Sequence, residues 1–382
     1  MGEAQTFTRV PDWAHLRRRY GACWRNELPD GRVIAHIQNP APVRPVPEPW
    51  MREAAEANYL DPARLFRLKA WRRTGWHWHT DLFNYSIPSY GPAVFTGFCG
   101  GRPVFGADTV WYEPVLTNLA AADRIRFDER NRYWRAHLEA IDYFAAQCRG
   151  VELLGLTDFG GPTDWIANLM GTENSLIAAL EQPDAMRAFA LRLAREYTRA
   201  YDLATARVAV ATDGYVNWLP VWSGCPLGTV QDDMAINLSP ALYREVFLPA
   251  LRVMAAHTRR TVLHWHDGCD QHLPALLDLP EIDMVQYGHD PNSPPFPAKL
   301  PAMQAIQAAG MRLFISCVEE RDAEFFIRRL DPRGLIMIIN TADDDASRRM
   351  EADVARWTAE RERAPQGPDV QDGDVRSSLG LI

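Results

Sequence analysis

Short apolar runs that suit strands alternate with amphipathic stretches that suit helices through most of this 382-residue chain. The predicted strands are the eight runs at 32–38, 110–115, 151–158, 216–222, 261–266, 283–287, 312–317 and 334–340. Between them, apolar side chains return at helical spacing, as Met186, Phe189, Leu193 and Tyr197 do in one predicted helix. Such alternation favours parallel strands joined by crossover helices, and eight strands suit a closed barrel.

The fold that this pattern predicts is α/β, with a single (β/α)8 TIM barrel over residues 31–362. Residues 1–30 are expected to add an N-terminal helical extension. Residues 363–382 are polar and contain Pro and Gly, so we expect a disordered tail there. The alternative is an open doubly wound sheet, but the segment GGPTDW at 160–165 lacks the G-x-G-x-x-G spacing of a phosphate loop.

Charge and composition exclude several classes of partner. The formal net charge is −8 and the arginines are scattered, so the chain has no basic stripe for a nucleic-acid backbone. Its longest apolar runs, such as LIMII at 335–339, are too short to cross a membrane. The six cysteines are spread without a C-x-x-C pair, which indicates free thiols in a reducing compartment and predicts a cytoplasmic protein.

Polar residues lie at or just beyond the end of nearly every predicted strand. The carboxyl ends of barrel strands meet at one mouth, where the active sites of this fold lie. Three carboxylates placed this way, Asp158, Asp232 and Asp267, are candidates for proton transfer or charge stabilisation, and Asp158 alternatively forms an Asx turn. The candidate substrate-binding residues are Glu113, Trp222, Gln286, His289 and Asn340.

The densest group of ionisable residues is LHWHDGCDQH at 263–272. His264 and His266 are two residues apart on a predicted strand, so their imidazoles share one face. With Cys317 from another strand end they would give Zn²⁺ three ligands and one open position, as in a catalytic zinc site. Asp267 and Glu113 are alternative third ligands, and Asp267 alternatively orients a histidine or acts as a base. The two histidines equally suit contact with a polar substrate, or a structural role without any ligand.

Five segments occur in a set order along the chain. They are GPAVFTGFCGG (91–101), GADTVWYEP (106–114), TDFGGPTDWIANLMGTENSL (157–176), VQDDMAINLSPALYREVFLPAL (230–251) and HWHDGCDQHLPALLDLPEIDMVQY (264–287). In this order the chain resembles the uroporphyrinogen decarboxylase-like superfamily over roughly residues 30–360, and it is most similar to uncharacterised members. The resemblance implies a (β/α)8 barrel with its site at the mouth.

The superfamily contains true uroporphyrinogen decarboxylases and zinc methyltransferases that work with corrinoid proteins. The segment RRRYGACWRNELPDGR at 17–32 does not match the R-Y-x-P-E signature of the true decarboxylases. The methyltransferases use H-x-C, where this chain has His264-Trp265-His266. Because an H-x-H pair can also bind zinc, the resemblance to the methyltransferases implies methyl transfer, with a corrinoid protein as partner and zinc as a cofactor.

Two other functions stay open at this point. One is metal-free decarboxylation of a carboxylated small molecule, and the other is a barrel that binds a ligand without turnover. Barrels of this superfamily often dimerise, so the resemblance also implies a homodimer.

Overall fold

The structure is a computed structural model, and it describes residues 7–10, 12–28, 31–39, 55–73, 77–106 and 109–363. The chain divides into two compact units. The first unit comprises Met1–Trp13, Val43–Thr74 and Phe83–Thr261, and the second comprises Ala14–Pro42, Gly75–Leu82 and Val262–Ile382. Of the predicted tail at 363–382, Arg363 ends α15 and residues 364–382 lie outside the described residues, as do residues 1–6, 11 and 29–30 of the predicted extension.

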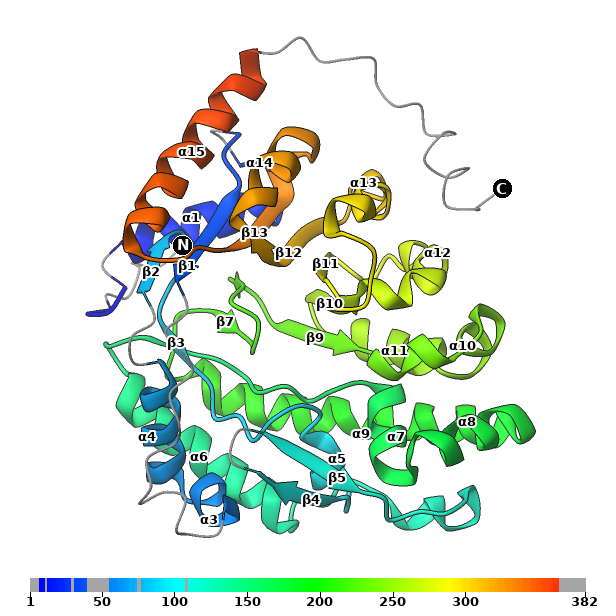
Figure 1. Cartoon of the computed structure of the whole chain (residues 1–382). Helices are drawn as coiled ribbons and strands as arrows, with labels where there is room; N and C mark the ends of the chain where they lie inside the picture. Colours follow the sequence, from blue (N-terminus) through cyan, green and yellow to red (C-terminus); the bar gives the residue numbers. More distant parts are fainter. Residues whose placement is uncertain are drawn as a thin grey trace. The chain divides into compact units, whose positions relative to one another are not determined.

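The second unit is built on strands that run parallel and alternate with helices (Figure 1). Strands β1, β13, β12, β11 and β10 pair in that order in parallel, and β2 pairs with β1 antiparallel. The strands are β1 (Ile34–Asn39), β2 (His77–Thr80), β10 (Arg260–His266), β11 (Met284–Gly288), β12 (Arg312–Glu319) and β13 (Leu335–Asn340). The first two residues of β10, Arg260 and Thr261, still belong to the first unit.

A helix follows each of the strands β10, β11, β12 and β13, as the sequence pattern predicts. The helices of this unit are α1 (Trp13–Cys23, from Ala14 on), α12 (Leu273–Leu277), α13 (Leu300–Ala308), α14 (Glu320–Arg329) and α15 (Asp344–Arg363). Short 3-10 turns, η3 (Asp267–His272), η4 (Phe296–Lys299) and η5 (Pro332–Gly334), join them to the strands. The strand interiors are buried and apolar, which is expected of a parallel sheet covered by helices.

The first unit is mostly helical among its described residues (Figure 1). Its helices are α3 (Ala55–Leu60), α4 (Pro62–Arg73), α5 (Phe95–Phe98), α6 (Arg132–Cys148), α7 (Pro162–Met170), α8 (Thr172–Glu181), α9 (Pro183–Ala209), α10 (Pro240–Val246) and α11 (Leu248–Ala255), with 3-10 turns η1 (Leu119–Arg124) and η2 (Asp233–Asn237). The long helix α9 buries Met186, Phe189, Leu193 and Tyr197, the face that the sequence predicts. Phe95, Trp165 and Tyr197 are in mutual ring contact in this core.

The strands of the first unit are short. They are β3 (Tyr85–Ser86), β4 (Arg102–Phe105), β5 (Val110–Glu113), β6 (Leu153–Leu154), β7 (Tyr215–Val216), β8 (Trp222–Ser223) and β9 (Leu227–Gln231). β3 and β6 pair in parallel, and beyond them Leu156 N–H donates to Val216 O at 2.9 Å. β9 begins beside the start of β10, where Arg260 N–H donates to Pro226 O at 3.1 Å.

Two predicted barrel strands are wrong. The run at 110–115 forms β5, which pairs antiparallel with β4 in a hairpin, and the run at 216–222 contains parts of β7 and β8, which also pair antiparallel. The sequence also missed β3, because two residues are too short to give an alternating pattern. The α/β class and the parallel sheet are confirmed, whereas closure of the strands into one barrel stays a prediction. None of the helices in the described part of the chain is both long and apolar enough to cross a membrane.

Gly161, the N-cap residue of α7, lies against the end of β9. A Cβ added there would lie 1.4 Å from Gln231 O, at the end of β9, although the φ of Gly161 is an ordinary −141°. The constraint on this residue is therefore steric rather than conformational, and it fixes how β9 meets α7.

We expect Gly161→Ala to destabilise the protein by at least ~3 kcal/mol, because backbone must move to admit the methyl group. Gly150→Ala is the matched control: Gly150 has φ +68° but no atom within 4 Å of an added Cβ, so only about 1 kcal/mol of strain is expected. Urea unfolding of both variants measures the difference. Equal free energies of unfolding would contradict the steric explanation.

Candidate functional site

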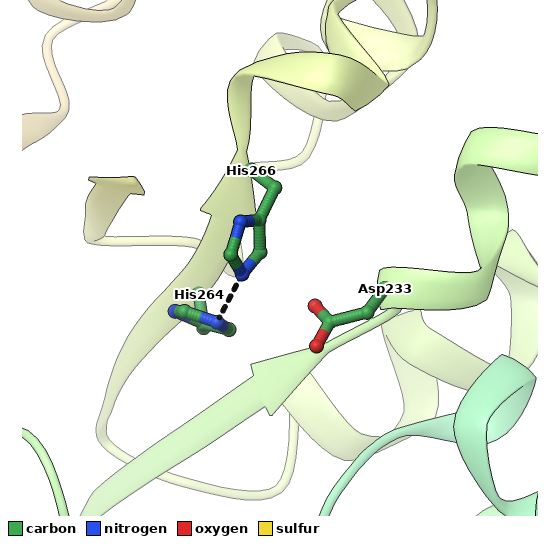
Figure 2. A group of neighbouring side chains, drawn as sticks. All are labelled: Asp233, His264 and His266. Atoms are coloured by element: carbon green, nitrogen blue, oxygen red, sulfur yellow. Dashed lines mark hydrogen bonds between the residues drawn. The ribbon is translucent and has the colours of Figure 1, made fainter. Parts of the chain in front are cut away.

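The two histidines of β10 lie on one face of the strand, as predicted (Figure 2). His264 is in register with Gln286 of β11, and His266 with Gly288. Their rings stand nearly perpendicular, and the two Nε2 atoms are 3.1 Å apart. Both side chains are partly exposed, so a small ligand has access to the nitrogens.

The other nitrogen of each ring is held by an oxygen. His266 Nδ1 lies 2.8 Å from Asp290 Oδ1, and His264 Nδ1 bonds Gln286 Oε1. The Gln286 amide nitrogen in turn donates to Ser316 Oγ at 2.6 Å. A carboxylate or an amide oxygen only accepts, so each Nδ1 carries the hydrogen and, in neutral rings, both Nε2 atoms keep their lone pairs. Two lone pairs 3.1 Å apart need a proton or a cation between them.

His266 ends β10 and is followed by Asp267, whereas His289 and Asp290 begin the loop after β11, and the two aspartates cross. Asp290 accepts from His266 and, at 3.1 Å, from Gly268 N–H. Asp267 accepts from His289 Nδ1 at 2.7 Å and from Asp290 N–H at 3.0 Å. Each aspartate therefore orients the histidine that precedes the other aspartate in the sequence.

Asp267 is the buried centre of this arrangement, with its side chain 0 % exposed. Burial alone would raise the pKa of Asp267, but hydrogen bonds from Ser293 Oγ (2.6 Å), from His289 and from Asp290 N–H outweigh it and lower the pKa. These three donors occupy the carboxylate, so Asp267 suits the orientation of His289 better than metal binding.

Buried carboxylates also gather in the first unit. Asp158 accepts from Gly160 N–H at 2.7 Å, the Asx turn that the sequence allows. Asp232 accepts from Thr163 N–H at 2.8 Å and from Tyr243 OH at 2.8 Å. Burial raises the pKa of both Asp158 and Asp232 to about 7.

A third carboxylate, Asp164, links the start of α7 to the end of β9 and to η2. Asp164, in the first turn of α7, accepts from Met234 N–H at 3.1 Å and from Gln231 at 3.2 Å. Burial raises the pKa of Asp164, and the charges of Asp233 and Asp232 add to the effect. Asp232 thus caps the start of α7 while Asp164 caps the start of η2, which favours a structural role for both.

The remaining candidate residues lie in varied settings. Glu113 is 55 % exposed on a hairpin and pairs with Arg102 at 3.2 Å. Trp222 is buried, and its indole N–H donates to Asp213 O at 2.6 Å. Asn340 accepts from Gln38 at 3.0 Å, and Cys317 is exposed at an irregularity of β12 with φ +59°.

Sequence reasoning missed Asp290, Ser316 and Asp164 as parts of these networks. A signal for Asp290 exists: the dipeptides His266-Asp267 and His289-Asp290 follow adjacent strands. Ser316 carries no such signal, because it is one of several small polar residues at strand ends.

Comparison with known proteins identifies a fold relative only. No protein-family model matches the chain, and no curated protein matches its sequence. Among solved structures, the chain is similar to a methyltransferase from Methanosarcina mazei, with a TM-score of 0.56 and 15% sequence identity. The match covers 91% of this chain and 98% of the other. A likeness at this identity establishes a shared fold and leaves the reaction to be argued from the site.

The raised pKa of Asp158 predicts a pH-dependent stability. Between about pH 4 and 7 the folded protein binds more protons at Asp158 than the unfolded chain does, so the free energy of unfolding falls as pH rises through this window. Asp158→Asn keeps the oxygen that accepts from Gly160 and removes the charge. We expect it to stabilise the protein at pH 8 by about 2–4 kcal/mol and to leave it nearly unchanged at pH 4.

Urea unfolding at several pH values measures this effect. Asp184→Asn, at a side chain 86 % exposed, serves as the control and should keep the slope of the wild type. Asp232 and Asp164 also have raised pKa values and leave part of the slope, but a slope in Asp158→Asn equal to that of the wild type would contradict the raised pKa of Asp158.

Proposed function

We propose that this chain transfers a methyl group, and that His264 and His266 belong to a divalent-metal site where the methyl acceptor or donor is held. The observation that carries the proposal is the convergence of two Nε2 lone pairs 3.1 Å apart, with both Nδ1 atoms held by acceptors. The fold shared with a methyltransferase from Methanosarcina mazei is consistent with it.

The donor set fits zinc. Zn²⁺ takes neutral imidazole nitrogens, and ligating histidines usually donate their other N–H to a carboxylate or a carbonyl oxygen. Asp290 and Gln286 supply these acceptors here. The site further needs one protein ligand and one open position, and the thiol of Cys317 is the candidate that the sequence offers.

The chain's own residues would divide the work. His264 and His266 would hold the metal, and Gln286 and Asp290 fix the tautomers of the two rings. Asp267 positions the loop that contains Asp290. A bound Zn²⁺ would lower the pKa of a thiol substrate and keep it as the nucleophilic thiolate near neutral pH. We further propose, from the family resemblance, that a corrinoid protein is the methyl-transfer partner.

A second candidate function is metal-free decarboxylation, and Asp158 is the observation that favours it. Burial raises the pKa of Asp158 to about 7, so the buried carboxyl can both give and take a proton near neutral pH. The protonation of a carbon that has lost CO₂ needs such a group.

Dimerisation stays a prediction, which light scattering tests.

Zinc titration into chelator-stripped protein tests the metal site. We expect one Zn²⁺ per chain, with at least ~100-fold weaker binding by His264→Ala and by His266→Ala. Gln286→Leu should weaken binding by about 10–100-fold, whereas Gln286→Glu keeps an acceptor at Nδ1 and should bind at least as tightly as the wild type. Binding should weaken as pH falls toward 5, because zinc needs neutral imidazoles.

The control is His257→Gln, which removes a histidine that pairs with Asp202 away from this strand. Cys317→Ser tests the third ligand. Equal affinity in wild type, His264→Ala and His266→Ala would exclude the metal site and leave the metal-free function.

Methyl transfer itself is tested with free methylcobalamin as donor and 2-mercaptoethanol as acceptor. The zinc-loaded wild type should accelerate the loss of the cobalt–methyl absorbance, and His264→Ala should not. Zinc binding without any acceleration would instead indicate a different donor or a barrel that binds without turnover.

A further inference from the structure

His289, the first residue after β11, has one ring nitrogen fixed and the other open. Its Nδ1 lies 2.7 Å from Asp267 Oδ2, and the side chain is 26 % exposed. A carboxylate only accepts, so Nδ1 carries the hydrogen and Nε2 keeps its lone pair. An imidazole oriented in this way by a buried aspartate is the arrangement that general bases use.

The ring is held in place by aromatic stacking as well. Phe296 stacks on the His289 ring with centroids 4.7 Å apart and planes 20° from parallel. Phe296 also stacks on Tyr287 and is in contact with Phe326 of α14. The imidazole therefore cannot turn freely, and Nε2 keeps one direction.

Most of the charged groups around His289 are carboxylates. Asp267 and Asp270 of η3 and Asp290 beyond β11 supply carboxylates, and Lys299 of η4 is the one ammonium group in this network of described residues. Lys299 is already held by Asp267 O at 3.0 Å and by Asp270 Oδ2 at 2.9 Å. Phe296 and Phe326 complete the surroundings with apolar surface.

The position of His289 links it to the two histidines of β10. His266 is in register with Gly288, so His289 follows directly beyond that pairing on the neighbouring strand. The crossed aspartates tie the loops together, since Asp290 N–H donates to Asp267 while Asp290 itself holds His266. His289 is thus fixed by the same contacts that fix the proposed metal ligand.

We propose that His289 accepts the proton that a thiol substrate loses when it binds beside His264 and His266. The inference rests on the proposed function. The S–H bond breaks and its electron pair stays on sulfur, while the proton forms a new bond to His289 Nε2. The ring keeps this proton while the thiolate is bound and passes it to water after the thiolate has left, so the step needs no further reactant.

Proton counting with a small thiol tests the proposal without turnover. Calorimetric titration of 2-mercaptoethanol into zinc-loaded protein at pH 7, in buffers of different ionisation enthalpy, gives the number of protons released for each thiol bound. The His289→Gln variant, whose amide can still donate to Asp267, should release about one proton, because the thiol ionises and no base retains the proton. The wild type and the control His257→Gln should release clearly less.

The outcomes separate the two proposals. Thiol binding with equal proton release by wild type and His289→Gln would overturn the role of His289 and leave the proposed function intact. Failure of the zinc-loaded wild type to bind the thiol would overturn both.

A second measurement needs neither metal nor variant. Nitrogen-15 NMR of the metal-free wild type, at a pH where the His289 ring is neutral, should show the ring protonated at Nδ1, with the lone pair on Nε2. A neutral ring protonated at Nε2 would overturn the proposal.

Discussion

The crossing of two carboxylates between the loops after β10 and β11 determines the geometry of the candidate site. Asp267 accepts from the His289 ring and from Asp290 N–H, both in the loop after β11. Asp290 in turn accepts from the His266 ring at the end of β10 and from Gly268 N–H just beyond it. Hydrogen bonds to charged groups contribute about 1.5–3 kcal/mol each, and bonds that share carboxylates act cooperatively. Neither loop can move without releasing a histidine of its neighbour, so the imidazoles are preorganised as one unit.

The buried carboxylates of this protein differ in pKa because hydrogen bonds offset the effect of burial to different degrees. Asp267 faces three donors and the ammonium of Lys299, and these lower its pKa against the effect of burial. Asp232 also has three donors, yet burial and the charge of Asp233 raise its pKa to about 7. The number of donors therefore does not decide the pKa of a buried acid. Burial has the largest effect at both carboxyls, and the donors outweigh it only at Asp267, which separates an ionised anchor from a group suited to carrying a proton.

The sequence predicted the second unit far better than the first. Strands β10 to β13 alternate with helices as the sequence pattern predicts, and the H-x-H spacing correctly placed both histidines on one face of β10. The runs at 110–115 and 216–222 have the same strand propensity but form hairpins, because pairing partners rather than propensity decide direction. The crossing of Asp267 and Asp290 could not be predicted either, since spacing along the chain does not show which carboxylate reaches which ring.

The Gln286 amide couples the histidines of β10 to Ser316. With Oε1 toward His264, the ring keeps a lone pair at Nε2, and the amide nitrogen donates to Ser316 Oγ. If the amide turns over, its nitrogen donates to His264 Nδ1, the proton moves to Nε2, and an ordinary hydrogen bond to His266 replaces the opposed lone pairs. Ser316 accommodates both states, because a hydroxyl donates as readily as it accepts. A cation between the rings selects the first state. Metal binding therefore makes the Ser316 hydroxyl an acceptor, through the orientation of the Gln286 amide.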